Sequence, residues 1–336
     1  MNKFKFYFIV LITTLSLFSC SNNDTTTEIT PPKDYAEQYK VDTAVIEAYL
    51  DTHYLDMDFT DPNFADMDVV IKPIPVDGLQ RRIKSYEDNA TEGNTNFPQL
   101  WSRNVSLHGI NYKVYYLVLR EGKENTLTLK GGKSPTNADA VLASYNGSYL
   151  QSSTIVTATP FEESKFPNQF FSLLGTIKGW GEIFPQFKTG SYTSNNDGTV
   201  TFTDFGAGVM FLPSGLAYFQ NGPGSIPSYA PLVFSFKLYE IQRLDTDGDG
   251  ILNYQEDVNI DLDDNNDTDK NNFGYMYDYR NLVNYPTFPE DKIRYADDTD
   301  RDGIPNFLDV DDDGDGYTTK LEISEETDYL DKNSHP

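Results

Sequence analysis

The chain has 336 residues, enough for two domains or for one large domain with appendages. Its 52 Asp and Glu residues against 26 Lys and Arg give a formal net charge of −26, which disfavours binding to nucleic acid or to anionic lipid surfaces. A single Cys excludes an internal disulfide framework and a Cys-rich zinc site, and three scattered His residues are too few for a His-built metal centre.

The first 20 residues have the features of a secretory signal peptide. Lys3 and Lys5 form a short positive region ahead of an apolar stretch from Phe6 to Phe18. This stretch is too short to cross a bilayer as a stop-transfer helix, so export followed by cleavage is the preferred interpretation.

The only Cys of the chain, Cys20, stands at the expected cleavage position, in an arrangement that resembles a bacterial lipobox. The resemblance implies a signal peptide over residues 1–19 and a lipid on Cys20. Residues 20–40 would then be a polar tether that holds the protein at the bacterial cell envelope, at the outer membrane. An ordinary signal peptide with an incidental Cys is the alternative.

A helix is predicted after the tether. From Val41 to Leu55 the apolar residues recur at helical spacing, with Asp42 or Thr43 available as the N-cap. The sequence from residue 56 to about 98 is irregular and rich in Asp and Asn. We therefore expect a helical and irregular segment over residues 41–108, to which the sequence assigns no role.

The next part of the chain alternates strand-like runs with polar loops and contains a single short helix candidate, Ile177–Phe187. Runs rich in β-branched and aromatic residues predict five strands: Ile110–Leu119, Ala140–Tyr145, Thr199–Thr203, Gly208–Leu212 and Leu232–Ile241. Many strands with one short helix predict an α+β domain in which an antiparallel β-sheet packs on that helix.

The sequence lacks a nucleophile elbow, an HExxH motif, a P-loop and a Rossmann glycine fingerprint. It has instead an ordered series of aromatic landmarks. They are Tyr145-Asn-Gly, Phe161-Glu162-Glu163-Ser164, FSLLGTIKGWGEIFPQFKTG around Trp180, LPSGLAYF around Tyr218, and SIPSYAPLVFSFKLYEI from Ser225 to Ile241. Over residues 109–242 this series resembles the FKBP-type peptidyl-prolyl cis-trans isomerases.

The resemblance implies an apolar pocket that binds proline-containing polypeptides and needs no cofactor for catalysis. Trp180 would form its floor, Tyr218 would offer a hydroxyl to the substrate backbone, and Glu162 stands where the family has Asp. The remaining wall residues would be Tyr145, Phe161, Phe171, Ile177, Ile226 and Phe234. The alternative for each of these side chains is an ordinary place in the core.

Acidic residues are concentrated in the last part of the chain, since residues 245–336 contain 27 Asp and Glu against 7 Lys and Arg. Three segments there match the calcium-loop pattern, in which oxygens at positions 1, 3, 5, 7 and 12 converge on one cation and Gly at position 6 allows the turn. The candidate ligands are Asp245, Asp247, Asp249, Ile251 and Glu256; Asp298, Asp300, Asp302, Ile304 and Asp309; and Asp311, Asp313, Asp315, Tyr317 and Glu322.

These phrases resemble thrombospondin type 3 repeats, which implies a structural role for calcium in residues 243–336. Asp261–Asp269 would add further ligands. With so much Asp and so little apolar surface, we expect this module to fold only with calcium present. A solvated acidic tail without fixed structure is the alternative.

Three functions follow from these features. The first is an exported, lipid-anchored peptidyl-prolyl isomerase that assists the folding of envelope proteins. The second is an FKBP fold that has lost turnover and holds proline-containing segments, favoured by Glu162, by Phe219 in place of the customary Gly, and by an insertion over residues 191–206. The third is a calcium-dependent structural protein of the cell surface.

Overall fold

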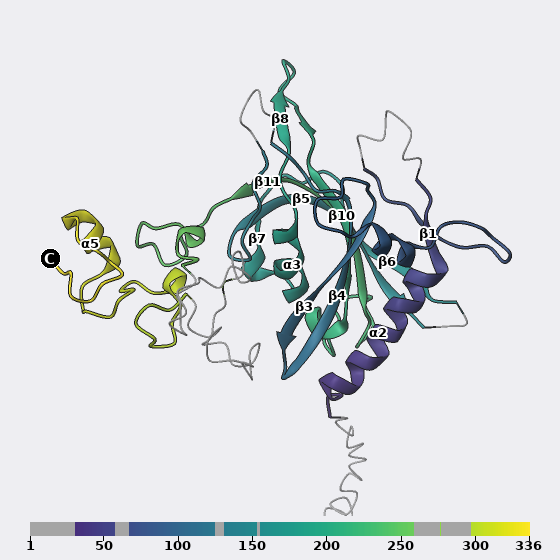
Figure 1. Cartoon of the computed structure of the whole chain (residues 1–336), viewed down its shortest axis with the longest axis horizontal. Coiled ribbons are helices and arrows are strands. Elements are labelled where there is room, and N and C mark those ends of the chain that lie inside the picture. The colour runs from purple at the N-terminus through teal and green to yellow at the C-terminus, as the bar shows by residue number, and fades with distance from the viewer. Residues whose placement is uncertain (1–30, 58–66, 125–130, 153–154, 259–275, 277–296) are drawn as a thin grey trace, which may run out of the picture. The chain divides into compact units, whose positions relative to one another are not determined.

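A computed structural model of the chain describes residues 31–57, 67–124, 131–152, 155–258, 276 and 297–336 (Figure 1). The chain divides into two units, Met1–Pro32 and Lys33–Pro336, and every element below belongs to the second. The predicted signal peptide, Cys20 and Asp261–Asp269 lie outside the described residues. Within the described ranges, no helix has the length and apolarity needed to cross a membrane.

Seven of the described strands form one antiparallel sheet (Figure 1). Its strands follow the order β3-β4-β10-β11-β5-β6, and the short β7 also pairs with β5. Their bounds are β3 Gln99–Leu107, β4 Ile110–Arg120, β5 Ala140–Gln151, β6 Thr157–Ser164, β7 Phe171–Ser172, β10 Gly206–Leu212 and β11 Leu232–Gln242. The predicted antiparallel sheet is confirmed, and all five predicted strand runs are strands.

The sheet is buried on both faces because its side chains alternate between two apolar layers. In β10, Met210 and Leu212 belong to the layer that contains α3 (Lys178–Ile183). Val209 and Phe211 belong to the layer that contains α2 (Tyr35–Thr52). The prediction of a sheet covered by one short helix was therefore incomplete, because α2 covers the second face.

Helix α2 begins six residues before the predicted start, and its N-cap is Asp34, whose carboxylate accepts a hydrogen bond from the Glu37 amide at 3.0 Å. Asp42, expected near the helix start, is instead buried within the helix and accepts hydrogen bonds from the amide and hydroxyl of Ser214 at 2.7 and 2.6 Å. The predicted tether over residues 20–40 is thus wrong for its last residues, which are helical.

The predicted boundary at residues 108/109 is also wrong, because it falls inside the hairpin of β3 and β4, where Leu107 pairs with Ile110. Pro185 lies within the predicted helix Ile177–Phe187 and shortens it. The α-helix α3 ends at Ile183 and a 3₁₀ turn, η4 (Phe184–Gln186), follows it. The expected insertion over residues 191–206 contains a separate hairpin of β8 (Ser191–Ser194) and β9 (Val200–Thr203).

The remaining described elements are short. Two strands pair with each other, β1 (His53–Leu55) and β2 (Ile71–Pro73). The acidic segment ends with one α-helix, α5 (Thr319–Glu325). The other 3₁₀ turns are η2 Ile83–Asn89, η3 Leu173–Gly175, η5 Ser214–Leu216, η6 Asn253–Gln255 and η7 Asn306–Leu308.

Candidate functional site

A cavity of about 910 Å³ lies beside α3 and the inner layer of the sheet. Its wall combines residues from α3, from β5 and β11, and from the segment that follows η5. Seven residues singled out in the sequence line it: Tyr145, Glu162, Phe171, Ile177, Trp180, Tyr218 and Phe234. Residues that lie far apart along the chain are thus brought to one concave, largely aromatic surface.

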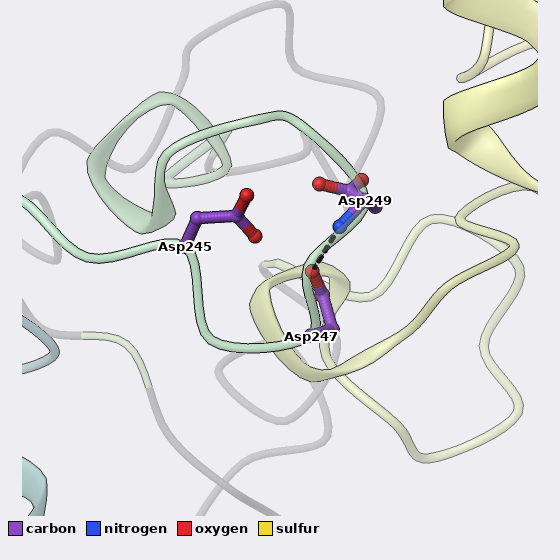
Figure 2. A group of neighbouring side chains, drawn as sticks. All are labelled: Asp245, Asp247 and Asp249. Carbon is purple, nitrogen blue, oxygen red and sulfur yellow. Dashed lines mark hydrogen bonds between the residues drawn. The ribbon is translucent and has the colours of Figure 1, made fainter.

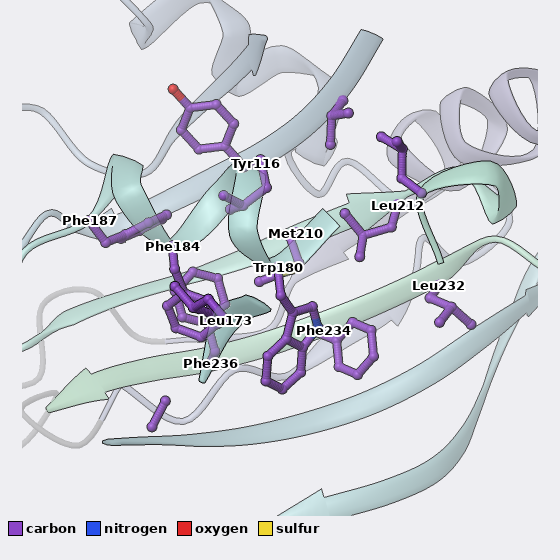
Figure 3. Packing of buried hydrophobic residues seen from close by; sticks show 14 of the residues in the cluster. Tyr116, Leu173, Trp180, Phe184, Phe187, Met210, Leu212, Leu232, Phe234 and Phe236 are labelled. Atoms are coloured by element: carbon purple, nitrogen blue, oxygen red, sulfur yellow. The ribbon is translucent and has the colours of Figure 1, made fainter. Parts of the chain in front are cut away.

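Trp180 is only 6% exposed and is surrounded by other rings (Figure 3). Tyr145 and Phe234 meet it edge to face, at centroid distances of 4.9 and 5.1 Å, and Phe171 lies 5.2 Å away. Such edge contacts stabilise aromatic pairs beyond the area that they bury. The indole Nε1 has no hydrogen-bond partner among the described residues, so the rigid floor of the cavity includes an unused donor.

Two glycines allow these rings to come together. A Cβ on Gly179 would lie 2.6 Å from Leu212 Cδ1, so the absence of a side chain lets α3 lie close against β10. A Cβ on Gly147 would lie 2.7 Å from ring atoms of both Phe161 and Phe234. The Gly in the Tyr145-Asn-Gly phrase therefore has a packing reason.

The other two predicted wall residues, Phe161 and Ile226, are not part of the cavity lining. Phe161 is half-buried and packs edge to face on Phe234 at 5.7 Å. Ile226 is buried in the apolar layer around α3. These two side chains thus pack in the apolar layer beside the cavity, and their contact with a client stays a prediction.

The cavity lining includes polar groups as well as rings, among them Tyr145, Glu162 and Tyr218. The Tyr145 hydroxyl donates to Glu162 Oε1 at 2.9 Å, so the longer side chain of Glu still reaches the tyrosine. Burial, and then this carboxylate, raise the pKa of Tyr145 to about 12. Burial also raises the pKa of Tyr218, so both phenols stay protonated donors near neutral pH. The site is suited to binding an apolar segment and its carbonyls rather than to acid–base chemistry.

One rim of the cavity comes from residues that the sequence did not identify as a site. Tyr35, the first residue of α2, stacks between His108 and Phe219, with ring centroids 3.7 and 4.1 Å apart. Burial lowers the pKa of His108 to about 4, so its imidazole is neutral at pH 7. Phe219, which departs from the family pattern, serves as the stacking partner. Only that departure could have drawn attention to this rim.

The opposite edge of the cavity is formed with the acidic segment, through Asn137, Met276 and Leu308. Asn137 Oδ1 accepts from the Met276 amide at 2.7 Å, and the Asn137 side chain also donates to the Met276 carbonyl. Phe307 is fully buried in a small apolar cluster with Ala138 and Met276. The predicted division at residues 242/243 is therefore crossed by contacts that reach the cavity.

Each of the three predicted calcium loops brings its first three Asp side chains together. Within each loop, carboxylate oxygens of these three residues lie within 4.8 Å of one another. The three groups are Asp245, Asp247 and Asp249 (Figure 2); Asp298, Asp300 and Asp302; and Asp311, Asp313 and Asp315. The same backbone turn recurs in each loop. Asp249, Asp302 and Asp315 accept hydrogen bonds from the amides of Ile251, Ile304 and Tyr317, each at 2.7 Å.

The closing residues of the loops differ in their surroundings. Glu256 and Glu322 are fully buried, whereas Asp309 is half-buried. Burial, and then Asp247 and Asp312, raise the pKa of Glu256 to about 10, and burial raises the pKa of Glu322 to about 6. Ligation by the carbonyls of Ile251, Ile304 and Tyr317 stays a prediction.

The donor set fits a hard cation, because every candidate side chain offers oxygen and calcium takes six to eight oxygens. Several carboxylate oxygens in the loops are buried and accept no hydrogen bond from the described residues, among them one each in Asp247, Asp298, Asp311, Asp313 and Asp315. Buried carboxylates without partners are costly unless a positive charge meets them.

Comparison with known proteins gives two sequence matches. A family model described as BamM C-terminal matches residues 246–334. The FKBP-type peptidyl-prolyl cis-trans isomerase FkpA of Aeromonas hydrophila is 32% identical over 120 residues, which is 35% of this chain and 37% of that protein. The chain thus spans little more than a third of the length of this curated relative. The match supports the resemblance to FKBP-type isomerases.

Two solved structures are similar as well. One is a peptidyl-prolyl cis-trans isomerase of Pseudomonas syringae pv. tomato, 19% identical, covering 48% of this chain and 90% of that one with a TM-score of 0.29. The other is FkpA of Escherichia coli, 22% identical, covering 47% and 56% with a TM-score of 0.29. The acidic segment matches the BamM C-terminal model, and its resemblance to thrombospondin type 3 repeats stays a prediction.

Proposed function

We propose that the chain is a peptidyl-prolyl cis-trans isomerase that assists the folding of exported envelope proteins. The observation that carries the proposal is the cavity floored by Trp180, in which Tyr145, Phe171 and Phe234 surround an unused indole N–H. The sequence match to an FKBP-type isomerase supports it independently of the structure.

Catalysis by such a cavity requires no covalent step. Rotation about a prolyl amide faces a barrier of roughly 18–20 kcal/mol, because the resonance of the planar form must be broken. A twisted amide is less polar than a planar one, so an apolar surface that excludes water favours the twisted form. Each tenfold in rate requires about 1.4 kcal/mol of such differential binding. The Tyr218 hydroxyl is available to hold a flanking carbonyl of the client, whereas the Trp180 N–H is itself buried.

The setting of this activity follows from the N-terminal pattern. A signal peptide over residues 1–19 and a lipid on Cys20 would place the cavity outside the cytoplasm, anchored to the outer membrane. Prolyl isomerisation takes tens to hundreds of seconds at 25 °C and limits the folding of many chains. The clients are proline-containing polypeptides, and the net charge of −26 argues against nucleic acid.

We also propose that the three acidic loops bind calcium in a structural role. The repeated turns, together with the buried carboxylate oxygens that have no partner among the described residues, support this assignment. The loop that carries Phe307 and Leu308 would then hold one edge of the cavity in place when calcium is bound.

A proline-segment binder with little turnover is the second candidate. It is favoured by the stack of Tyr35 on Phe219, which adds a bulky aromatic rim where the family has Gly after the tyrosine. A rigid rim of this kind favours holding a segment over releasing it.

The test is cis/trans exchange in a short X-Pro peptide, measured by NMR with the full-length chain in detergent. The chain has two Trp residues, so Trp180→Phe has a matched control in Trp101→Phe. Trp101 is half-buried on β3, donates to Gln99 Oε1 at 3.0 Å and lies outside the cavity lining. We expect exchange to be accelerated by the wild type and by Trp101→Phe, and about tenfold less by Trp180→Phe.

Folded wild type that binds the peptide without accelerating exchange would establish the binder. Binding is read from the fluorescence of the remaining tryptophan in the Trp101→Phe variant. Equal losses in the two variants would refute the assignment of Trp180 as the floor of the site.

A further inference from the structure

Three buried carboxylates from two different loops meet in the acidic segment. Oxygens of Asp249, Glu256 and Asp312 lie within 4.8 Å of one another, and the three residues are 3%, 1% and 1% exposed. Asp249 and Glu256 belong to the first calcium loop, whereas Asp312 is the second residue of the third loop. The loop pattern assigns no role to that second position.

These side chains lack the partners that buried carboxylates ordinarily have. Both oxygens of Glu256, both of Asp312 and Oδ2 of Asp249 accept no hydrogen bond from the part of the chain that the structure describes. Groups so placed either take up protons or face a cation.

The cations of the described chain do not fill this role. The positive charge of Lys320 acts on Asp249, but this side chain is exposed and its ammonium group donates to the Gly248 carbonyl at 3.2 Å. Asp245 and Asp247 add two more carboxylates beside the three, because they share Asp249 in the first loop. One divalent cation in that loop would balance only two of these five charges.

We propose that Asp249, Glu256 and Asp312 form a separate divalent-cation site that joins the first loop to the third. Asp249 can offer Oδ2 to this site, since Oδ1 accepts from the Ile251 amide and Oδ2 accepts no hydrogen bond within the described residues. Three carboxylates with no nitrogen or sulfur donor select a hard cation, and we assign calcium. Only this choice of ion rests on the proposed calcium loops.

The site explains why the acidic segment is not three independent loops. A cation held by Asp312 on one side and by Asp249 and Glu256 on the other fixes the third loop against the first. Binding of calcium to these two loops is therefore coupled, and removal of Asp312 weakens both.

The experiment compares Asp312→Asn with Asp328→Asn, a control at an exposed position of the same segment. Bound calcium is counted by native mass spectrometry and equilibrium dialysis on the full-length chain in detergent. We expect Asp312→Asn to bind one calcium ion fewer than the wild type, and the control to bind as many as the wild type.

Thermal unfolding, measured with calcium and with a chelator, separates a ligand from a merely structural residue. With calcium, Asp312→Asn loses a ligand and its melting temperature falls by several degrees. With chelator, the same change removes one of several crowded charges, so the melting temperature stays level or rises. The sign of the effect therefore depends on calcium.

Equal destabilisation in both conditions would overturn the site, because Asp312 would then be structural. If Asp312→Asn binds as much calcium as the wild type and is stabilised by it equally, the proposed site is also overturned. The proposal that the three loops bind calcium would not be affected by this result. A wild type that binds no calcium at all would overturn the loops and this site together.

Discussion

Replacing Gly147 by Ala tests whether the packing of two aromatic rings sets the shape of the cavity. The added Cβ would lie 2.7 Å from Phe161 Cζ and from Phe234 Cε1, well inside the van der Waals distance. The Phe234 ring cannot move freely, because it also packs against Trp180 and Tyr145. Overpacking of this kind costs about 1–3 kcal/mol, and the ring that yields moves the cavity wall.

Two measurements check this prediction. Thermal or denaturant unfolding should show a loss of about 1–3 kcal/mol, and peptide isomerisation should fall several-fold, because Phe234 is displaced from its place beside Trp180. Gly175→Ala is the control for stability, since a Cβ there meets nothing within 4 Å and the backbone is not in the left-handed region. We expect it to change stability by less than about 1 kcal/mol.

A Gly147→Ala variant as stable as the Gly175→Ala control would refute the reasoning, because the two rings would then have room that the structure does not show. Loss of stability with full isomerase activity would refute a narrower point. It would mean that the positions of Phe161 and Phe234 do not govern turnover.

Two further predictions concern the edges of the cavity. Because burial lowers the pKa of His108 to about 4, the unfolded chain binds a proton there more readily than the folded chain, and stability should fall by about 1–2 kcal/mol between pH 7 and pH 5. His108→Phe keeps the stack on Tyr35 and should remove this part of the pH dependence in thermal melts; an unchanged profile would contradict it. At the other edge, Phe307→Ala should cost about 3–5 kcal/mol in calcium-containing buffer, because the ring is fully buried with Ala138. Leu321→Ala, 40% exposed on α5, is its control, and equal melting temperatures for the two variants would show that the contact contributes little.

The strands that sequence reasoning located were those with dense β-branched and aromatic runs, such as β4 and β11. Strand β6 escaped because its side chains are mostly half-buried or exposed, so its apolar signal is weak. Strand β3 did carry a signal, since Val105 and Leu107 alternate with polar residues and are buried. A hairpin with the neighbouring run from Ile110 was therefore within reach of the sequence.

The start of α2 was misplaced for a physical reason. Gln38 and Asp42 are polar yet buried, and Gln38 donates to Asp42 at 2.6 Å. Asp42 also accepts from Ser214, and Gln38 donates to the Tyr229 carbonyl at 3.3 Å. Apolar periodicity detects only side chains that are buried because they are apolar. A helix end fixed by buried hydrogen bonds is invisible to it.

The residues of the candidate site likewise fall into those that sequence motifs could locate and those that they could not. The order of the sequence motifs located the aromatic residues of the cavity, because Trp180, Tyr145 and Phe234 each lie in a motif that resembles one of the FKBP-type isomerases. It did not locate Tyr35 or Asp312, whose roles depend on contacts between segments that are distant in sequence. Spacing within one loop predicts ligands of that loop and contains no information about which second loop packs beside it.

The two edges of the cavity show that the site needs residues from outside the predicted domain 109–242. Residues 109–242 contain Trp180 and most of its neighbours, yet α2 supplies Tyr35 at one rim and the acidic segment supplies Leu308 at the other. The same residues would also leave one face of the sheet bare, because α2 covers Val209 and Phe211. The segment Thr136–Asp139 connects these parts, since Asp139 pairs with Arg243 and its carbonyl accepts from the Leu173 amide at 2.9 Å, just ahead of α3. The unit that holds the cavity intact is therefore Lys33–Pro336. Through Arg243 and Asp139, a change in the predicted calcium loops can reach the floor of the cavity that Trp180 forms.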